Sequence, residues 1–260
     1  MLRKILLSSV AFVAVSTAAF AADLPNRKVA PAAPYVAAPI FTWTGFYVGA
    51  QVGGGWTNDK MRAYNTATNV YQGYGKLNGS GVVGGLFAGY NWQMSNSIVL
   101  GVEGDIEATS ISPKSVAVYN PAGVLAGGDY SYNESLPWQG SLRARAGYAA
   151  GNALFYVTGG LALAQINTKY ITTGVASSSF SGTQAGWTLG AGIEYAFNQN
   201  WTLRGEYRYT QFAGSKDNVA NAANNLWTGS TFKHSVNENQ VRVGIAYKFG
   251  APASAVVAKY

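Results

Sequence analysis

The residues best suited to chemistry are acids and bases that occur at alternate positions within short segments. The acids are Glu103, Asp105, Glu107, Glu194 and Glu206, and the bases are Arg143, Arg145, Arg204, Arg208, Arg242 and Lys248. A spacing of two places successive side chains on one face of a β-strand, so these strands would gather both signs of charge on one surface. Paired carboxylates can hydrolyse glycosidic bonds, whereas acids paired with arginines form ion networks.

Catalysis, metal binding and cofactor binding find little support in the remaining residues. An arginine beside a carboxylate favours its ionised form, which cannot act as a general acid. The chain has one histidine, His234, and no cysteine. A catalytic triad on this charged face and a thiolate metal site are therefore excluded, and we expect neither an enzyme nor a cofactor.

The composition favours a sheet that is apolar on one face. Charged residues make up 11% and aromatic residues 13% of the 260 residues, with 32 glycines and a mean hydropathy of +0.03. A disordered chain has more charge and fewer aromatic residues, and a helical membrane protein needs runs of about 20 apolar residues. The net charge is +7, but Arg27 and Lys28 alone do not make a patch for nucleic acid.

Eight segments between residues 42 and 249 alternate between apolar residues and polar or small residues. This period of two predicts β-strands with one apolar face. The expected strands are residues 43–56, 82–93, 98–108, 136–150, 153–165, 184–197, 201–211 and 240–249. No charged residue falls on the apolar face of any of them.

The connections between these segments alternate between short and long. The short ones are residues 94–97, 151–152 and 198–200, and the long ones are residues 57–81, 109–135, 167–183 and 212–239. Outer-membrane barrels have tight periplasmic turns and longer outer loops, whereas a soluble sandwich gives no reason for such an alternation. We predict an all-β fold over residues 42–249, an eight-stranded antiparallel transmembrane up-and-down β-barrel with its charged face turned into the lumen.

Aromatic residues lie at both ends of the apolar face, where a barrel meets the two membrane surfaces. Beside the short turns we expect a periplasmic girdle of Phe46, Tyr90, Trp92, Tyr148, Phe155, Tyr195, Phe197, Trp201, Tyr247 and Phe249. At the opposite ends we expect an outer girdle of Trp56, Trp138, Trp187 and Tyr209. The long loops carry tyrosines and lysines that could contact a host or cell-surface ligand.

The charged lumen admits two interpretations. An eight-stranded barrel is only wide enough for side chains or one small ligand, and Glu103, Asp105 and Glu107 can face Arg143 and Arg145 on the next strand. Such pairs would close the lumen with salt bridges and give a structural barrel of the envelope. Rings of charge would instead line a narrow channel for small solutes.

The ends of the chain differ in composition from the barrel. Arg3 and Lys4 precede an apolar stretch and a small-x-small site, which predicts a signal peptide over residues 1–21. Residues 22–41 contain four prolines, which oppose helix and ladder pairing, so we expect an extended periplasmic arm. Residues 250–260 are a tail after the last strand.

The sequence resembles the small outer-membrane proteins of alphaproteobacteria. The similarity lies in the order and spacing of WTGFYVGAQVGGGW, GGLFAGYNWQ, LRARAGYA and VRVGIAYKF. This family includes major surface antigens, proteins named as porins and haemin-binding proteins on an eight-stranded barrel of the OmpA type. The resemblance implies a Gram-negative outer membrane, its lipid as surroundings, and a surface role in antigenicity or adhesion.

Two further expectations depend on this resemblance. The barrel-assembly machinery would recognise the last strand, although such barrels end on an aromatic residue and here a tail follows Phe249. Haemin binding at the outer loops would depend on His234 as its candidate ligand.

Overall fold

The computed structural model describes residues 41–115, 119–120, 123–124, 130–172, 178–213, 216–219 and 230–250. The predicted signal peptide, nearly all of the arm and nearly all of the tail lie outside these residues. Within the described residues, no helix is long and apolar enough to cross a membrane. The strands belong to one sheet of fourteen.

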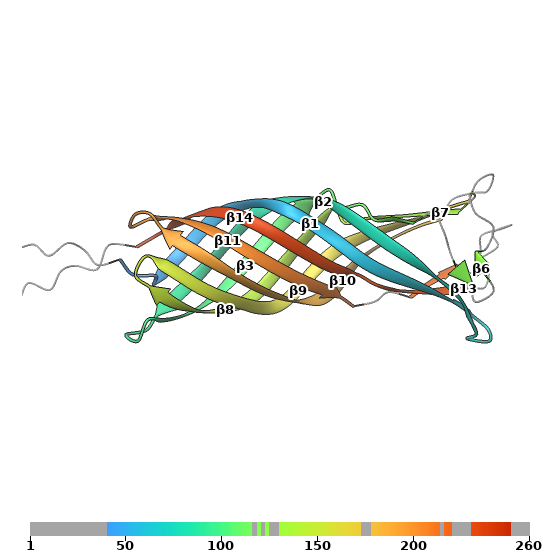
Figure 1. The fold of residues 1–260 in the computed structure, drawn as a ribbon, viewed down its shortest axis with the longest axis horizontal. Coiled ribbons are helices and arrows are strands. Elements are labelled where there is room, and N and C mark those ends of the chain that lie inside the picture. Colours follow the sequence, from blue (N-terminus) through green and yellow to red (C-terminus); the bar gives the residue numbers. More distant parts are fainter. Residues whose placement is uncertain are drawn as a thin grey trace, which may run out of the picture. The chain divides into compact units, whose positions relative to one another are not determined.

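Eight long strands form the wall of a closed barrel (Figure 1). They are β1 (Gly45–Asn65), β2 (Tyr71–Gln93), β3 (Ile98–Thr109), β8 (Trp138–Ala150), β9 (Ala153–Thr172), β10 (Ser178–Ala196), β11 (Trp201–Phe212) and β14 (Asn237–Lys248). Each pairs antiparallel with the next in this order, and β14 pairs back onto β1. Closure leaves no free edge in this part of the wall, and the predicted eight-stranded barrel is confirmed.

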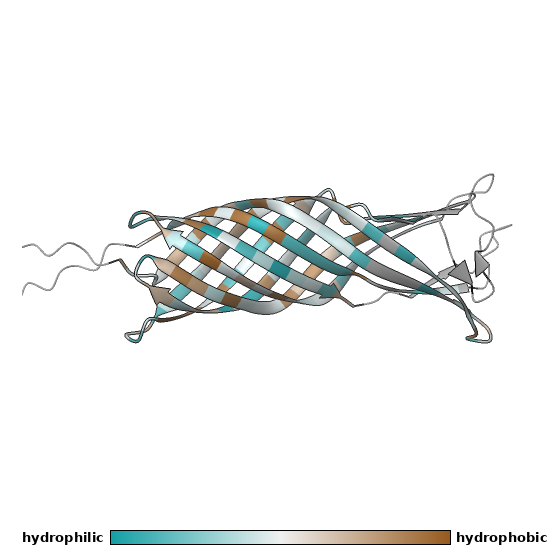
Figure 2. Ribbon diagram, in the orientation of Figure 1, coloured by the Kyte–Doolittle hydropathy of each residue, from teal (hydrophilic) through white to brown (hydrophobic). Residues whose placement is uncertain are grey.

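Side chains alternate between the lumen and the outside along each barrel strand. In β11, exposed and buried residues alternate from Trp201 onwards. The apolar side chains point outward, so that Leu161 is 70% exposed, while charged residues such as Arg143 are buried. Figure 2 shows the corresponding alternation of hydrophobic and hydrophilic residues along the strands. This inversion of the usual soluble pattern places the apolar face against lipid.

The short turns carry the backbone conformations that tight reversals need. Ser97 has a φ of 66° and Gly151 a φ of 61°, both in the left-handed region. In the third turn, the Asn198 side chain accepts hydrogen bonds from the backbone N–H groups of Asn200 and Trp201, at 2.9 and 2.8 Å. All three turns therefore hold the strand ends close together.

The outer ends of the strands differ from the sequence prediction. Residues 57–81 were expected to form a loop, but β1 continues to Asn65 and β2 begins at Tyr71, and their hairpin projects to the right in Figure 1. Likewise β9 continues to Thr172 and β10 begins at Ser178. Both loop predictions are wrong because water lies on both sides of a strand outside the membrane. The alternation then disappears although the ladder continues.

Short strands extend this outer part of the wall. They are β4 (Lys114–Ser115), β5 (Tyr119–Asn120), β6 (Gly123–Val124), β7 (Tyr130–Ser135), β12 (Lys216–Val219) and β13 (Ser230–Ser235). β4 pairs with β2 and β7, β7 pairs with β9, and β13 pairs with β1 and β12. Hydrogen-bonded sheet therefore occupies much of the region predicted as loops.

A glycine stands directly opposite each of the five lumen arginines in the ladders. The pairs are Gly160 with Arg143, Gly101 with Arg145, Gly244 with Arg204, Gly190 with Arg208, and Gly53 with Arg242. A Cβ added at Gly160 would lie 2.7 Å from the Cα of Arg143, well inside the optimal separation of carbon atoms. The missing side chain lets the two backbones approach closely at this point of the ladder.

We predict that Gly160→Ala lowers the folded fraction after refolding in detergent, because the new methyl group meets the neighbouring backbone. The matched control is Gly205→Ala, since a Cβ at Gly205 has no atom within 4 Å. Heat-modifiable migration in gel electrophoresis measures the folded fraction of both variants. Equal folding of the two would contradict this account of the inward glycines.

Candidate functional site: the charged lumen

Ten buried side chains form one ion network in the middle of the lumen. Five are acidic and five are arginines, so their formal charges balance. They are Glu103, Asp105, Glu107, Glu194, Glu206, Arg143, Arg145, Arg204, Arg208 and Arg242. The structure thus brings together all the predicted lumen charges except Lys248.

Arg143 on β8 is the hub of this network. Its Nη2 lies 2.5 Å from Glu103 Oε1 and 3.1 Å from Asp105 Oδ2, and its Nη1 lies 2.7 Å from Glu206 Oε1. The ladder pairs Arg143 directly with Glu103, as expected for the neighbouring strands β3 and β8. One guanidinium therefore joins carboxylates from opposite walls of the barrel.

Other ion pairs reach across the lumen from β3. Glu103 Oε2 lies 2.6 Å from Arg204 Nη1, and Asp105 Oδ1 lies 3.1 Å from Arg208 Nη1. Their partners lie on β11, which is four strands away around the ring. A contact between opposite strands must pass through the barrel axis. These pairs therefore reach across the lumen from one wall to the opposite one.

Four further ion pairs belong to the same network. Arg242 Nη1 lies 2.6 Å from Glu107 Oε1, and Arg242 also pairs with Glu206. Arg208 pairs with Glu107, and Arg145 pairs with Glu194. Each of these charges thus has at least one opposite charge within bonding distance, which a buried ion requires.

Neutral side chains satisfy the remaining oxygens and cover the arginines. The Tyr47 hydroxyl donates to Glu103 Oε2 at 2.8 Å, and the Tyr156 hydroxyl donates to Glu206 Oε2 at 2.9 Å. The Arg145 guanidinium lies 3.8 Å from the centre of the Tyr156 ring, and that of Arg204 lies 3.4 Å from the centre of the Phe87 ring. The charges are therefore packed as well as paired.

The sequence prediction omitted these neutral residues. Tyr47 and Phe87 stand at alternate positions whose side chains point into the lumen. Gln51 and Gln139 stand at such positions as well, and both hydrogen-bond to Glu107. The alternation along each strand is enough to predict that these four side chains point inward. The prediction selected inward residues by charge and so passed over aromatic and amide side chains.

Apolar layers lie in the lumen on both sides of the ion network. The periplasmic layer consists of Trp43, Val99, Ala149, Leu154, Tyr156 and Ala196, with Phe41 packed against it. The outer layer consists of Leu136, Ala162, Ala164, Ile166, Phe212 and Val236. Trp43 is 1% exposed and its backbone N–H donates to the Gln93 side chain at 2.7 Å. Phe41 and Trp43, which precede β1, thus belong to the apolar layer at the periplasmic end.

The ion network does not include the buried residues Lys248 and Glu238. The Lys248 ammonium lies 5.0 Å from the centre of the Phe41 ring at the periplasmic end, and no ion pair among the described residues includes it. Its predicted place in the network is therefore wrong, because Lys248 lies near the end of β14, six residues beyond Arg242. Glu238 is buried nearer the outer end, where the Gln240 amide donates to it at 2.8 Å.

The aromatic side chains of both predicted girdles lie on the outward face. On the periplasmic side, the rings of Phe46 and Phe249 are 5.7 Å apart and those of Trp201 and Tyr247 are 5.2 Å apart. On the outer side, the rings of Trp187 and Tyr209 are 5.4 Å apart. Trp138 Nε1 donates to Gln165 Oε1 at 2.6 Å. The tryptophan and tyrosine rings among them join an apolar body to a polar group.

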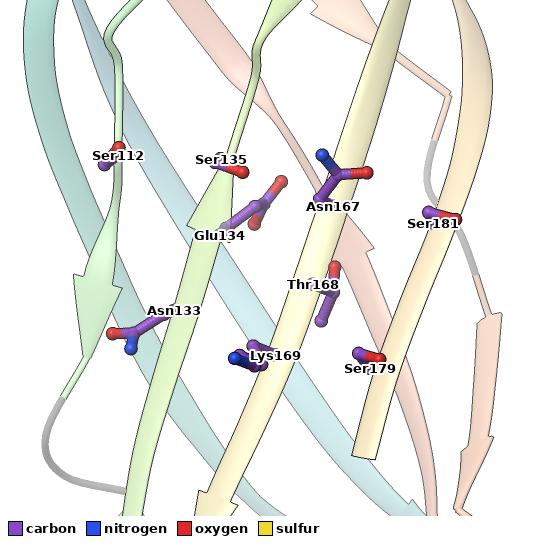
Figure 3. A pocket seen from close by; sticks show the side chains of 9 residues that line it. All are labelled: Ser112, Asn133, Glu134, Ser135, Asn167, Thr168, Lys169, Ser179 and Ser181. Carbon is purple, nitrogen blue, oxygen red and sulfur yellow. The ribbon is translucent and has the colours of Figure 1, made fainter. Parts of the chain in front are cut away.

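A polar groove lies on the wall beyond the outer girdle (Figure 3). It has a volume of about 450 Å³ and is lined by Ser112, Asn133, Glu134, Ser135, Asn167, Thr168, Lys169, Ser179 and Ser181. These residues come from β7, β9, β10 and the segment before β4. Hydroxyl and amide groups dominate the lining, and Lys169 is its exposed cation.

The structure shows no cluster of three or more His, Cys, Asp or Glu side chains placed to hold a metal ion, within the residues that it describes. His234 lies on β13, where the ladder pairs it with Met61 of β1.

The comparison with known families agrees with this geometry. The outer membrane protein beta-barrel domain matches residues 7–249 of the chain. The chain belongs to this family. It is therefore an outer-membrane β-barrel protein of a Gram-negative bacterium, and the resemblance to small alphaproteobacterial outer-membrane proteins is confirmed.

Named relatives cover almost the whole length of the chain. The 31 kDa outer-membrane immunogenic protein of Brucella melitensis is 38% identical over 257 residues, which cover 95% of this chain and 100% of the relative. The 22 kDa outer membrane protein of Rhizobium leguminosarum is 35% identical over 211 residues, which cover 81% and 80% of the two chains. The family therefore includes proteins named for immunogenicity.

A solved structure shares the fold at low sequence identity. The outer membrane protease OmpT of Escherichia coli superposes with a TM-score of 0.50 at 10% identity, covering 82% of this chain and 99% of that chain. This likeness concerns the barrel alone, since so low an identity carries no information about activity.

We predict that Arg143→Ala lowers the free energy of unfolding by about 3–5 kcal/mol, because Glu103 and Glu206 would lose a partner while remaining buried. The control is Arg62→Ala, which removes an exposed arginine outside the barrel lumen. Urea titration in detergent, followed by tryptophan fluorescence, measures both variants. An unchanged midpoint for Arg143→Ala would contradict the pairing described above.

Proposed function

We propose that the protein is a sealed structural barrel that supports the outer membrane and displays a surface-exposed antigenic or adhesive region. The observation that carries the proposal is the filled lumen. A charge-balanced network of ten side chains crosses it, and apolar layers lie on both sides of that network.

This filling opposes conduction in two ways. A permeating ion would have to displace arginines and carboxylates that are paired with one another, and the displaced charges would be left unpaired in a medium of low dielectric constant. It would also have to cross two apolar layers, and hydrophobic constrictions exclude water and ions. The alternative of a narrow channel for small solutes would require both features to rearrange.

The outer part of the wall supports the surface role. Relatives are named as immunogenic outer-membrane proteins, and antibodies reach only what projects from the cell. Here the projecting strands present exposed Tyr71 and Tyr74, side chains that supply contact area at low entropic cost. We further propose that lipid surrounds the two girdles and that the assembly machinery recognises β14.

Haemin binding stays a prediction that depends on His234. The ladder register pairs His234 with Met61, and both residue types ligate haem iron. Loss of haemin binding in His234→Ala would support this function, and absence of binding to the wild-type protein would remove it.

The proposal predicts that the refolded mature protein, starting at Ala22, produces no discrete current steps in a planar lipid bilayer. Heat-modifiable migration of the same sample establishes that the protein is folded, and a known porin establishes that the bilayer reports channels. Steady steps whose size changes when Arg143 or Arg145 is replaced by Gln would contradict a sealed lumen and favour the channel.

A further inference from the structure

The outer wall carries a cluster of cations on β1, β2 and β13, which we call the basic face. It consists of Arg62, Lys76 and Lys233, and all three side chains are exposed. The ladders pair Arg62 with Lys233 and with Tyr74. Since directly opposite residues share a face, and residues two apart on a strand do as well, the three cations point the same way.

The register of this region gathers positive charge without neutralising it. Arg62 and Lys233, both cationic and exposed, stand directly opposite each other in the ladder. Like charges directly opposite each other destabilise a sheet. Among the described residues, no ion pair includes Arg62, Lys76 or Lys233. The arrangement therefore favours an anionic partner, which would relieve the repulsion.

Tyrosines lie next to these cations. The Lys233 ammonium is 4.4 Å from the centre of the Tyr64 ring, and the Tyr64 and Tyr71 rings meet edge to face with their centres 5.8 Å apart. Aromatic rings provide flat contact area, while the cations provide charge. This combination suits a saccharide that bears phosphate or carboxylate groups better than it suits a small inorganic anion.

The height of the basic face above the membrane indicates where such a saccharide would come from. Arg62 follows Trp56 of the outer girdle by six residues on the same strand. At about 3.3 Å per residue and a tilt of 35–45°, the rise is about 15 Å. Lys76 pairs with Lys60, which follows Trp56 by four residues, so the same calculation gives a rise of about 10 Å for Lys76. The face points sideways from the wall, into the layer occupied by the sugar headgroups of the outer leaflet.

We propose that the basic face binds the anionic headgroup of the outer-leaflet glycolipid, through its phosphate and carboxylate groups. The glycolipid surrounds the barrel at this height, its charge is opposite to that of the face, and its sugars match the tyrosines. The proposal does not depend on whether the lumen is sealed, because none of its residues belongs to the ion network.

The test is the binding of purified lipopolysaccharide to the refolded full-length mature protein in neutral detergent. The variant Arg62→Gln/Lys76→Gln/Lys233→Gln keeps the side chains polar and lies outside the barrel lumen. We expect its affinity to fall at least tenfold, since each basic residue near an anionic lipid surface contributes to binding. The matched control is Lys169→Gln, an exposed lysine on β9 in the polar groove, and it should bind like the wild type.

Two further measurements show whether the bound anion is the glycolipid headgroup or a soluble polyanion. Wild-type affinity should fall steeply when salt is raised to about 1 M, where charges more than about 3 Å apart are screened. Dextran sulfate, a soluble polyanion, should compete only weakly. Equal lipopolysaccharide binding by the triple variant and the wild type would overturn the proposal. Tight binding of dextran sulfate, with no lipopolysaccharide binding by the wild type, would instead assign the face to a soluble polyanion.

Discussion

The pairing of buried charges in the lumen is the interaction on which the rest of the structure depends. Removing a charged side chain from water costs several kcal/mol unless opposite charges and hydrogen bonds replace the water. In this barrel the replacement comes from the far wall as well as from the next strand, as in the contact of Glu103 with Arg204 at 2.6 Å. The barrel must therefore close with its strands in one register. If one strand shifted by a single residue, its charged side chains would point outward into the lipid.

The residues around these ion pairs are small on the neighbouring strands and apolar at both ends of the lumen. Every lumen arginine stands opposite a glycine, and at Gly160 an added Cβ would meet the backbone of the neighbouring strand. The apolar layers around Trp43 and Leu136 separate the network from water at both ends. Low dielectric constant strengthens the ion pairs inside, and the same filling leads to the proposal of a barrel without a channel.

The sequence predicts this fold well because the membrane imposes its patterns on the sequence. Lipid requires an apolar outward face, the two membrane surfaces favour aromatic residues, and the periplasmic turns are short. It also predicts that the acids of residues 103–107 face Arg143 and Arg145 on the next strand, and the ladder pairs Glu103 with Arg143. The contact of Arg143 with Glu206 across the lumen depends on strand stagger and arginine length, which alternation does not encode. Alternation also ends where the membrane ends, so the continuation of β1 to Asn65 and the separate position of Lys248 were missed.

A double-mutant cycle on Arg242 and Glu206 tests the central claim most directly. The two residues form an ion pair inside the lumen, and the variants Arg242→Met, Glu206→Gln and their combination would be compared by urea unfolding in detergent. If the network holds the barrel together, the double variant loses less stability than the sum of the single losses, by about 1 kcal/mol or more, as contacting residues do. Losses that add within about 0.5 kcal/mol would show independent sites and contradict the account.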